Sequence, residues 1–231
     1  MPSLDDLKKR IASVKSTQKI TKAMQMVAAA KLRKAQEAAE QSRPYADNME
    51  NLMDSISRGY IQTDSSRNLL TGNDEDKTIL LVLFTSERGL CGGFNSQVSK
   101  ALREKIIELQ NQNKTVKVLC VGKKGYDIIK RQYGDLIVEM IDLSSVKSIQ
   151  YEDAKNISDK IIKMYFDAEF DRCLIFYNKF KSVISQIPTE QQVIPAEKSE
   201  DETNEDQSKD NSFFEFEPNE KEILEELLPL N

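Results

Sequence analysis

A regular seam of apolar and small residues extends from Leu4 to Ser57. Its members recur at alternating spacings of three and four residues, which is the register of a coiled coil. They are Leu4, Leu7, Ile11, Val14, Gln18, Thr21, Gln25, Ala28, Leu32, Ala35, Ala39, Ser42, Ala46, Met49, Met53 and Ile56. A helix of this length would measure roughly 80 Å, far more than covering one small domain requires. The spacing therefore predicts one long helix over residues 1–58, with Pro44 bending the helix rather than ending it.

The middle of this predicted helix has an unusual composition. From Ile20 to Ala30, the side chains are apolar or small on nearly every side of the helix. Pairing with a single second helix would leave half of that surface in water. We therefore expect other protein to enclose this region.

Charge is distributed unequally along the chain, whose formal net charge is −5. Nine basic residues lie in a stretch without any Asp or Glu: Lys8, Lys9, Arg10, Lys15, Lys19, Lys22, Lys31, Arg33 and Lys34. Thirteen acidic residues lie between Glu197 and Glu226, with only three lysines among them. The basic stretch suits either a solvated helix face or a nucleic-acid binder. Because no Phe, Tyr or Trp lies between Lys8 and Lys34, no ring can stack on a base there, which disfavours nucleic acid.

Strand and helix patterns alternate in the middle of the chain. Thr78–Thr85 and Thr115–Val121 are apolar runs typical of buried strands, and Asn95–Gln112 has helical spacing. The remaining patterns predict a helix from Gly122 to about Gln132, a strand over Leu136–Ile141, a helix over Tyr151–Asp167, a strand over Arg172–Asn178, and one strand or a broken pair over Ser182–Ile194. This order predicts an α/β fold, a small Rossmann-like domain with a mainly parallel sheet over residues 77–195.

The segments beside this domain have other compositions. Residues 59–76 are mostly polar and predict a connecting loop, and residues 196–216 predict an acidic flexible loop. Residues 217–231 begin with Pro and acidic residues and continue with apolar ones, which predicts the start of a C-terminal helical region.

The chain contains no histidine, which removes much catalytic chemistry. A Ser-His or Cys-His nucleophile pair and a Cys/His zinc site are both impossible. Cys91, Cys120 and Cys173 are widely spaced and form no Cys-x-x-Cys pair. The missing histidine therefore weighs against an enzyme and excludes a Cys/His metal site.

Two glycine-rich turns follow predicted strands, where α/β folds often bind phosphate. The first runs from Ser86 to Asn95, and the second is Gly122-Lys123-Lys124-Gly125. The first turn fits neither the dinucleotide fingerprint nor the P-loop spacing. It has two interpretations, a structural turn or a nucleotide site that uses Gly89 to Gly93. Cys91 is either an activated thiol beside a helix N-terminus or, as we expect without a histidine, a packed thiol.

Four separated segments resemble the gamma subunit of F-type ATP synthase. They are Ile11-Ala12-Ser13-Val14-Lys15-Ser16-Thr17-Gln18-Lys19-Ile20-Thr21-Lys22-Ala23-Met24-Gln25-Met26-Val27-Ala28-Ala29-Ala30-Lys31-Leu32-Arg33, then Thr85-Ser86-Glu87-Arg88-Gly89-Leu90-Cys91-Gly92-Gly93-Phe94-Asn95, then Asn178-Lys179-Phe180, and Ser185-Gln186-Ile187-Pro188-Thr189. The resemblance covers essentially the whole chain, and the segments occur in the family's order.

The resemblance implies a rotor subunit that binds no nucleotide or other cofactor, holds no metal and has no catalytic residue of its own. The long helix would be half of an antiparallel coiled coil inside the ring of alpha and beta subunits, and the α/β domain would lie against epsilon and the membrane c ring, with delta also in the complex. The residues implied to face the ring are Lys19, Lys22, Met24, Met26, Val27, Lys31 and Arg33. The residues implied to form a structural turn are Arg88, Gly89, Cys91, Gly92 and Gly93.

The resemblance also raises two expectations about completeness and location. In the family a second long helix follows the acidic loop, whereas this sequence stops at Asn231, so we expect either a partial sequence or a truncated gene. No apolar stretch reaches the ~20 residues that cross a bilayer, and no secretion signal or organelle presequence is present. We expect peripheral association with the cytoplasmic face of a bacterial inner membrane. The alternative is an organelle-encoded subunit on the matrix side of the mitochondrial inner membrane.

Overall fold

The computed structural model describes residues 3–59, 68–73, 75–146 and 148–196, with side chains described except at 47 and 50–59. The chain divides into two compact units, Met1–Met53 and Asp54–Asn231, and each is considered by itself. The expected acidic loop and C-terminal helical region lie outside the described residues, apart from Ala196.

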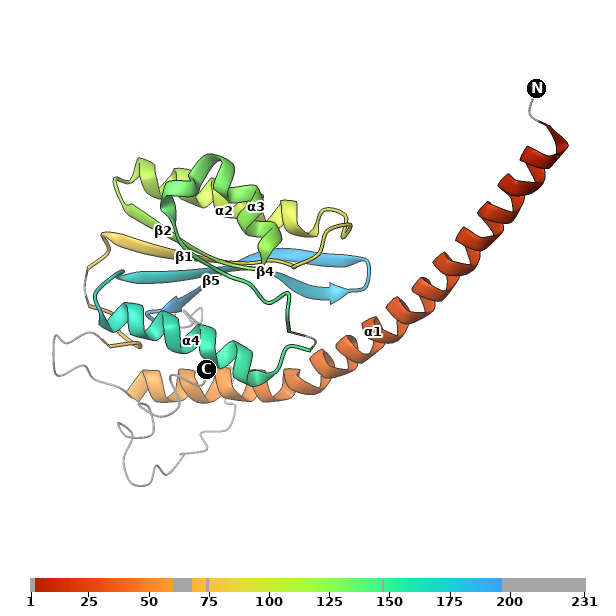
Figure 1. Cartoon of the computed structure of the whole chain (residues 1–231). Coiled ribbons are helices and arrows are strands. Elements are labelled where there is room, and N and C mark those ends of the chain that lie inside the picture. Colours follow the sequence, from red (N-terminus) through yellow and green to blue (C-terminus); the bar gives the residue numbers. More distant parts are fainter. Residues whose placement is uncertain (1–2, 60–67, 74, 147, 197–231) are drawn as a thin grey trace. The chain divides into compact units, whose positions relative to one another are not determined.

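The long N-terminal helix is α1, Leu4–Gly59. Ser3 and Asp6 cap its first turn reciprocally: the Asp6 amide N–H donates to Ser3 Oγ at 3.2 Å, and the Ser3 N–H donates to Asp6 Oδ2 at 3.2 Å. The helix continues through Pro44, as the seam predicts. Figure 1 shows its ribbon as curved and unbroken.

Five strands form one sheet in the order β3-β2-β1-β4-β5. They are β1 (Thr78–Phe84), β2 (Thr115–Val121), β3 (Ile137–Ile141), β4 (Arg172–Ser182) and β5 (Ser185–Ile194). Among the strands of the described residues, the pairs β1–β2, β2–β3 and β1–β4 are parallel, and only β5 is antiparallel to its neighbour, β4. The predicted fold class, a mainly parallel α/β domain and a long N-terminal helix, is therefore confirmed.

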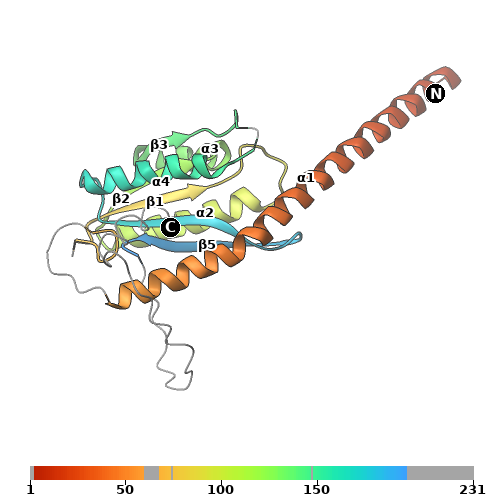
Figure 2. The ribbon, with the colours of Figure 1, turned by 90° about the horizontal axis from the view of Figure 1, so that it is seen from below.

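Helices cover both faces of this sheet. The helices α2 (Phe94–Asn111) and α3 (Lys123–Tyr133) lie on one face, and α4 (Tyr151–Phe166) lies on the other, as Figures 1 and 2 show. A short 3₁₀ turn, η1 (Gly134–Leu136), leads from α3 into β3. The sequential order of strand and helix produces these layers because each crossover carries its helix onto a sheet face.

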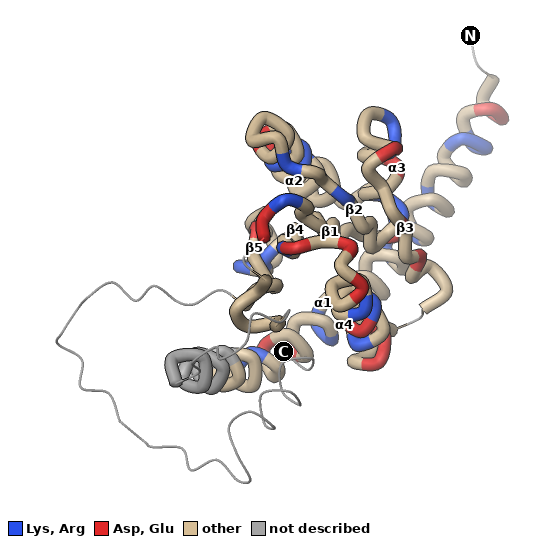
Figure 3. Tube along the Cα trace, turned by 90° about the vertical axis from the view of Figure 1, so that its left-hand side faces the viewer, with Lys and Arg blue, Asp and Glu red and all other residues tan. Residues whose placement is uncertain are grey.

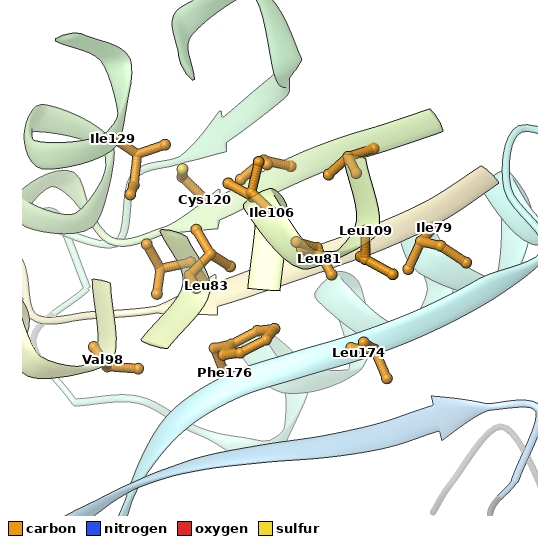
Figure 4. Close-up of a cluster of buried hydrophobic side chains, with 13 residues drawn as sticks. Ile79, Leu81, Leu83, Val98, Ile106, Leu109, Cys120, Ile129, Leu174 and Phe176 are labelled. Atoms are coloured by element: carbon orange, nitrogen blue, oxygen red, sulfur yellow. The ribbon is translucent and has the colours of Figure 1, made fainter. Parts of the chain in front are cut away.

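Alternate side chains of the strands enter two apolar clusters. Leu81, Leu83 and Phe176 pack with Leu102 and Ile129 of α2 and α3, and Figure 4 shows several members of this cluster. The cluster on the other face joins the sheet to α4. Its buried members are Leu80, Val82, Leu119, Val121, Ile157, Ile161, Tyr165, Phe170, Cys173 and Ile194. Burial on both faces explains why the central strands are continuous apolar runs.

The end of the sheet differs from the sequence expectation at β4 and agrees with one of the two alternatives at β5. β4 continues four residues beyond the predicted end at Asn178, to Ser182. The segment predicted as one strand or a broken pair is one strand, β5, which includes Pro188. Because β5 lies at the edge of the sheet, a proline there need not remove a ladder hydrogen bond.

Part of the predicted connecting loop belongs to the domain. Asn68 and Gly72 form an antiparallel bridge, and the Leu70 side chain between them is buried, at 2% exposure. The burial of Leu70 was not predicted, because the sequence around it is mostly polar.

Candidate functional site

The seven residues expected to contact other subunits all lie on α1 and are all exposed. The apolar side chains among them are exposed to an extent that is unusual for their type, with Met24 67% and Val27 58% exposed. Ile20 and Leu32, which flank them, are exposed as well. This section of helix therefore presents an apolar surface that no described part of its own unit covers.

The same seven residues occupy two sides of α1. Successive residues of a helix are rotated by about 100°, so Lys19, Lys22, Met26 and Arg33 share one side. Met24, Val27 and Lys31 share another, roughly 140° away by the same geometry. The predicted set therefore does not form a single contact stripe, and a partner that touches all seven must surround the helix.

The charges of this surface are almost entirely available to a partner. Figure 3 shows basic residues recurring along α1. Among the nine described basic residues of the acid-free stretch, Arg33 has an ion-pair partner, with its Nε 2.8 Å from Glu37 Oε1. Both side chains of that pair are exposed, so it stabilises the helix little. The surface suits a protein that offers apolar contact together with carboxylates.

The first glycine turn is closed by its own side chains. The Asn95 side chain accepts the Ser86 amide N–H at 3.0 Å through Oδ1 and donates to Ser86 Oγ at 2.8 Å through Nδ2. The Ser86 hydroxyl also donates to the Arg88 carbonyl at 2.6 Å. These bonds hold the end of β1 against the first turn of α2. Of the expected turn residues, Arg88, Gly89, Gly92 and Gly93 are exposed along the same segment.

Cys91 is exposed, so the expectation of a packed thiol is wrong. The Asn95 amide donates to its sulfur at 3.1 Å, so the thiol is exposed but has a hydrogen-bond partner within the turn. Cys120 and Cys173 are buried in the core. Burial raises the pKa of the Cys120 thiol to about 12 and raises the pKa of Cys173 as well, so both stay protonated at neutral pH.

Glu87 binds the N-terminus of α3. One carboxylate oxygen, Oε2, accepts the Lys123 amide N–H at 3.1 Å, and the other, Oε1, accepts the Leu143 amide N–H at 2.8 Å. An α/β nucleotide site uses such helix N-terminal amides for phosphate. Here the Glu87 carboxylate already accepts the Lys123 amide N–H, and its negative charge disfavours a phosphate at the start of α3.

The second glycine turn brings two backbones together. The Thr85 hydroxyl accepts the Gly125 amide N–H at 2.8 Å and donates to the Gly122 carbonyl at 3.2 Å. A Cβ on Gly122, whose φ is +102°, would lie 2.2 Å from the Thr85 carbonyl oxygen. Gly122 therefore allows β1 and α3 to approach, which is a packing role.

No role was predicted for Glu87, Thr85 and Asn95, although all three lie within the segment Thr85–Asn95. Their partners explain why: the bonds of Glu87 span 36 and 56 residues, and the bond from Gly125 to Thr85 spans 40. The sequence signal that could have indicated these roles was a hydroxyl and a carboxylate, Thr85 and Glu87, directly after a buried strand. In sheets of this kind, the end of a strand lies close to the start of the following helix.

Two further findings concern the described residues. Within the described residues, no group of three or more Cys, Asp or Glu could hold a metal ion. Among the helices that the structure describes, none is both long and apolar enough to cross a membrane.

Comparisons with known proteins agree on one family. A family model described as ATP synthase matches residues 3–231. The ATP synthase gamma chain of Sinorhizobium medicae is 53% identical over 231 residues, covering all of this chain and 78% of that protein. The gamma chain of Paracoccus denitrificans is 54% identical over 229 residues, covering 99% of this chain and 77% of that protein.

A solved structure supports the same conclusion. The central stalk and c ring of the mitochondrial ATP synthase of Tetrahymena thermophila contain a chain that is 28% identical, with a TM-score of 0.60. The match covers 76% of this chain and 72% of that chain. Together with the long exposed helix and the Rossmann-like domain, these similarities show that the chain belongs to the ATP synthase gamma-chain family.

Proposed function

We propose that this chain is the central-stalk, or rotor, subunit of an F-type ATP synthase, and that α1 is the part that transmits rotation. Membership of the gamma-chain family supports the role. The observation that carries the mechanism is the exposed apolar surface around Met24 and Val27, within a basic stretch that has no acidic residue.

The chain couples rotation to catalysis and is not itself catalytic. Each elementary charge that crosses the membrane releases about 2.3 kcal/mol per 100 mV, and this energy turns the c ring and the stalk. A partner's conformation shifts only if it interacts differently with the faces that it meets. One side of α1 carries Lys19, Lys22, Met26 and Arg33, and the other carries Met24, Val27 and Lys31, so rotation presents a different surface to each catalytic subunit in turn.

We assign the partners by part of the chain. The alpha and beta subunits surround α1 and contact Lys19, Lys22, Met24, Met26, Val27, Lys31 and Arg33. A second long helix pairs with α1 in antiparallel orientation. The α/β domain lies against epsilon and the membrane c ring, with delta elsewhere in the complex. The complex holds the chain at the cytoplasmic face of a bacterial inner membrane, the matrix side of the mitochondrial inner membrane being the alternative.

The glycine turn formed by Arg88, Gly89, Cys91, Gly92 and Gly93 is a structural connection in this proposal. The internal bonds of Asn95 and the Glu87 carboxylate at α3 support that role. A nucleotide-binding enzyme that uses Gly89 to Gly93 is not favoured, because the chain belongs to a rotor family.

Reconstitution tests the function directly. The chain is mixed with purified alpha and beta subunits, the complex is isolated by gel filtration, and ATP hydrolysis is measured for the complex and for the chain alone. We expect the chain to join the complex, and the isolated chain to show neither turnover nor affinity for labelled nucleotide. ATP turnover by the isolated chain, or its failure to join the complex, would contradict the proposal.

A further inference from the structure

A basic groove lies between α2 and α3, on the outer side of the helical layer. It has a volume of about 510 Å³. Three cationic side chains line it, Arg103 from α2 and Lys124 and Arg131 from α3, together with Asp127 and Ile128. Figure 3 marks basic positions on both helices. None of these residues belongs to the surface proposed for the alpha and beta subunits.

The three cations are not neutralised within the domain. In the described part of the chain, Arg103, Lys124 and Arg131 have no ion-pair partner. The carboxylate in the groove, Asp127, is already 2.8 Å from the Lys130 ammonium. That hydrogen bond and, less strongly, the charges of Lys130, Lys124 and Lys123 lower the pKa of Asp127, which reflects the positive surroundings. The groove therefore offers a net positive surface to a ligand.

The spacing of the cations indicates the kind of ligand. Lys124 and Arg131 are seven residues apart on one face of α3, a separation of about 10 Å along the helix. Arg103 lies on the opposite wall. Cations that are spread over two helices match a ligand that carries several negative charges, such as a peptide with several carboxylates. Ile128, which is half-buried between the two α3 cations, adds an apolar contact.

We propose that the groove between α2 and α3 binds an acidic segment of a protein partner, with carboxylates paired to Arg103, Lys124 and Arg131. The inference does not depend on the rotor role, because the groove lies entirely within the α/β domain. The presence of two walls, α2 and α3, makes binding in the groove specific. A single helix with cations on one side attracts acidic proteins weakly, whereas two facing helices fix the position of the bound segment.

The test uses the full chain and a fluorescein-labelled polyglutamate peptide, with fluorescence anisotropy as the measurement. We expect binding that weakens as salt increases, and about tenfold weaker binding after each charge reversal, Arg103→Glu and Arg131→Glu. Arg131→Gln should lose less than Arg131→Glu. The matched controls are Lys163→Glu on α4 and Lys15→Glu on α1, equal charge changes at exposed positions, which should leave the affinity unchanged. Circular dichroism checks that each variant is folded.

Four outcomes would overturn the proposal. The first is no binding of the peptide at low salt. The second is an equal loss in either control, which would show nonspecific attraction. The third is tighter binding of inorganic phosphate or of single-stranded DNA with the same dependence on Arg103 and Arg131. The fourth is tenfold tighter peptide binding when Asp201, Glu202 and Glu205 are changed to the corresponding amides, which would make the chain's own acidic stretch the occupant.

Discussion

The long helix and the α/β domain use apolar residues in opposite ways. In the domain, Leu81, Leu83 and Leu102 are fully buried. On α1, Met24 and Val27 are exposed, at 67% and 58%. Burying a side chain of this size stabilises a fold by about 1.5–3 kcal/mol, so the domain gains stability that α1 lacks. The domain is therefore stabilised by its own core, whereas the apolar surface of α1 is available for contact with other protein.

Polar groups follow the same division. In the domain, the buried Asp171 carboxylate accepts the amide N–H groups of Lys77 and Thr78 at 3.0 and 2.9 Å, and Glu87 bridges two segments. On α1, the cations of the acid-free stretch face water, with Arg33 paired to Glu37. Internal pairing fixes the domain's conformation, and unpaired cations leave α1 able to bind carboxylates.

The largest effect on the domain should come from Gly122→Val. A Cβ there would clash with the Thr85 carbonyl oxygen at 2.2 Å, at a φ that side chains rarely adopt. We expect the free energy of unfolding to fall by about 4 kcal/mol in urea titrations. Gly134→Ala is the control, because nothing lies within 4 Å of its Cβ position, and it should change stability by less than about 0.5 kcal/mol. Equal effects would mean that the close approach is not required.

A pair of truncations compares the two regions directly. Leu102→Ala removes a fully buried side chain and should lower the free energy of unfolding by about 3 kcal/mol. Met24→Ala removes an exposed one and should change it by less than about 0.5 kcal/mol. Both are measured by urea unfolding of the isolated chain. A large loss for Met24→Ala would show that α1 is already covered in the isolated chain.

A smaller effect should follow from Glu87→Ala. The change removes the acceptor for the Lys123 and Leu143 amides and should cost about 1–2 kcal/mol in urea unfolding. The control is the exposed neighbour Arg88→Ala, expected within about 0.5 kcal/mol of the parent. If Glu87→Ala also created affinity for labelled ATP, the vacated α3 N-terminus would be a latent anion site.

Sequence patterns predicted the elements well where local chemistry decides them. The predicted strand Thr115–Val121 has the same bounds as β2, because its β-branched and apolar residues end at the turn residue Gly122. The end of β4 was missed, since Lys179 and Lys181 alternate with Phe180 on a strand that is no longer buried on both faces. The order of strands and the role of Glu87 depend on contacts between distant segments, which local periodicity does not contain.

The site was predicted unevenly for the same reason. The exposure of Met24 and its neighbours follows from apolar residues on every side of one helix, which the sequence shows directly. The exposure of Cys91 was predicted wrongly, because it depends on how a turn with Leu90 and Gly92 at positive φ projects from the domain. The acidic stretch after Ala196 lies outside the described residues.

The most direct test of the central claim, that protein surrounds α1, is to compare Lys22→Glu with Lys31→Glu. The two positions are nine residues apart, two and a half turns, and so lie on opposite sides of the helix. Affinity of the chain for a mixture of alpha and beta subunits is measured for each variant, with Lys163→Glu as the control on α4. The account predicts about tenfold weaker binding for both variants. Weakening by only one of them would mean that a partner contacts a single side of α1, and would contradict it.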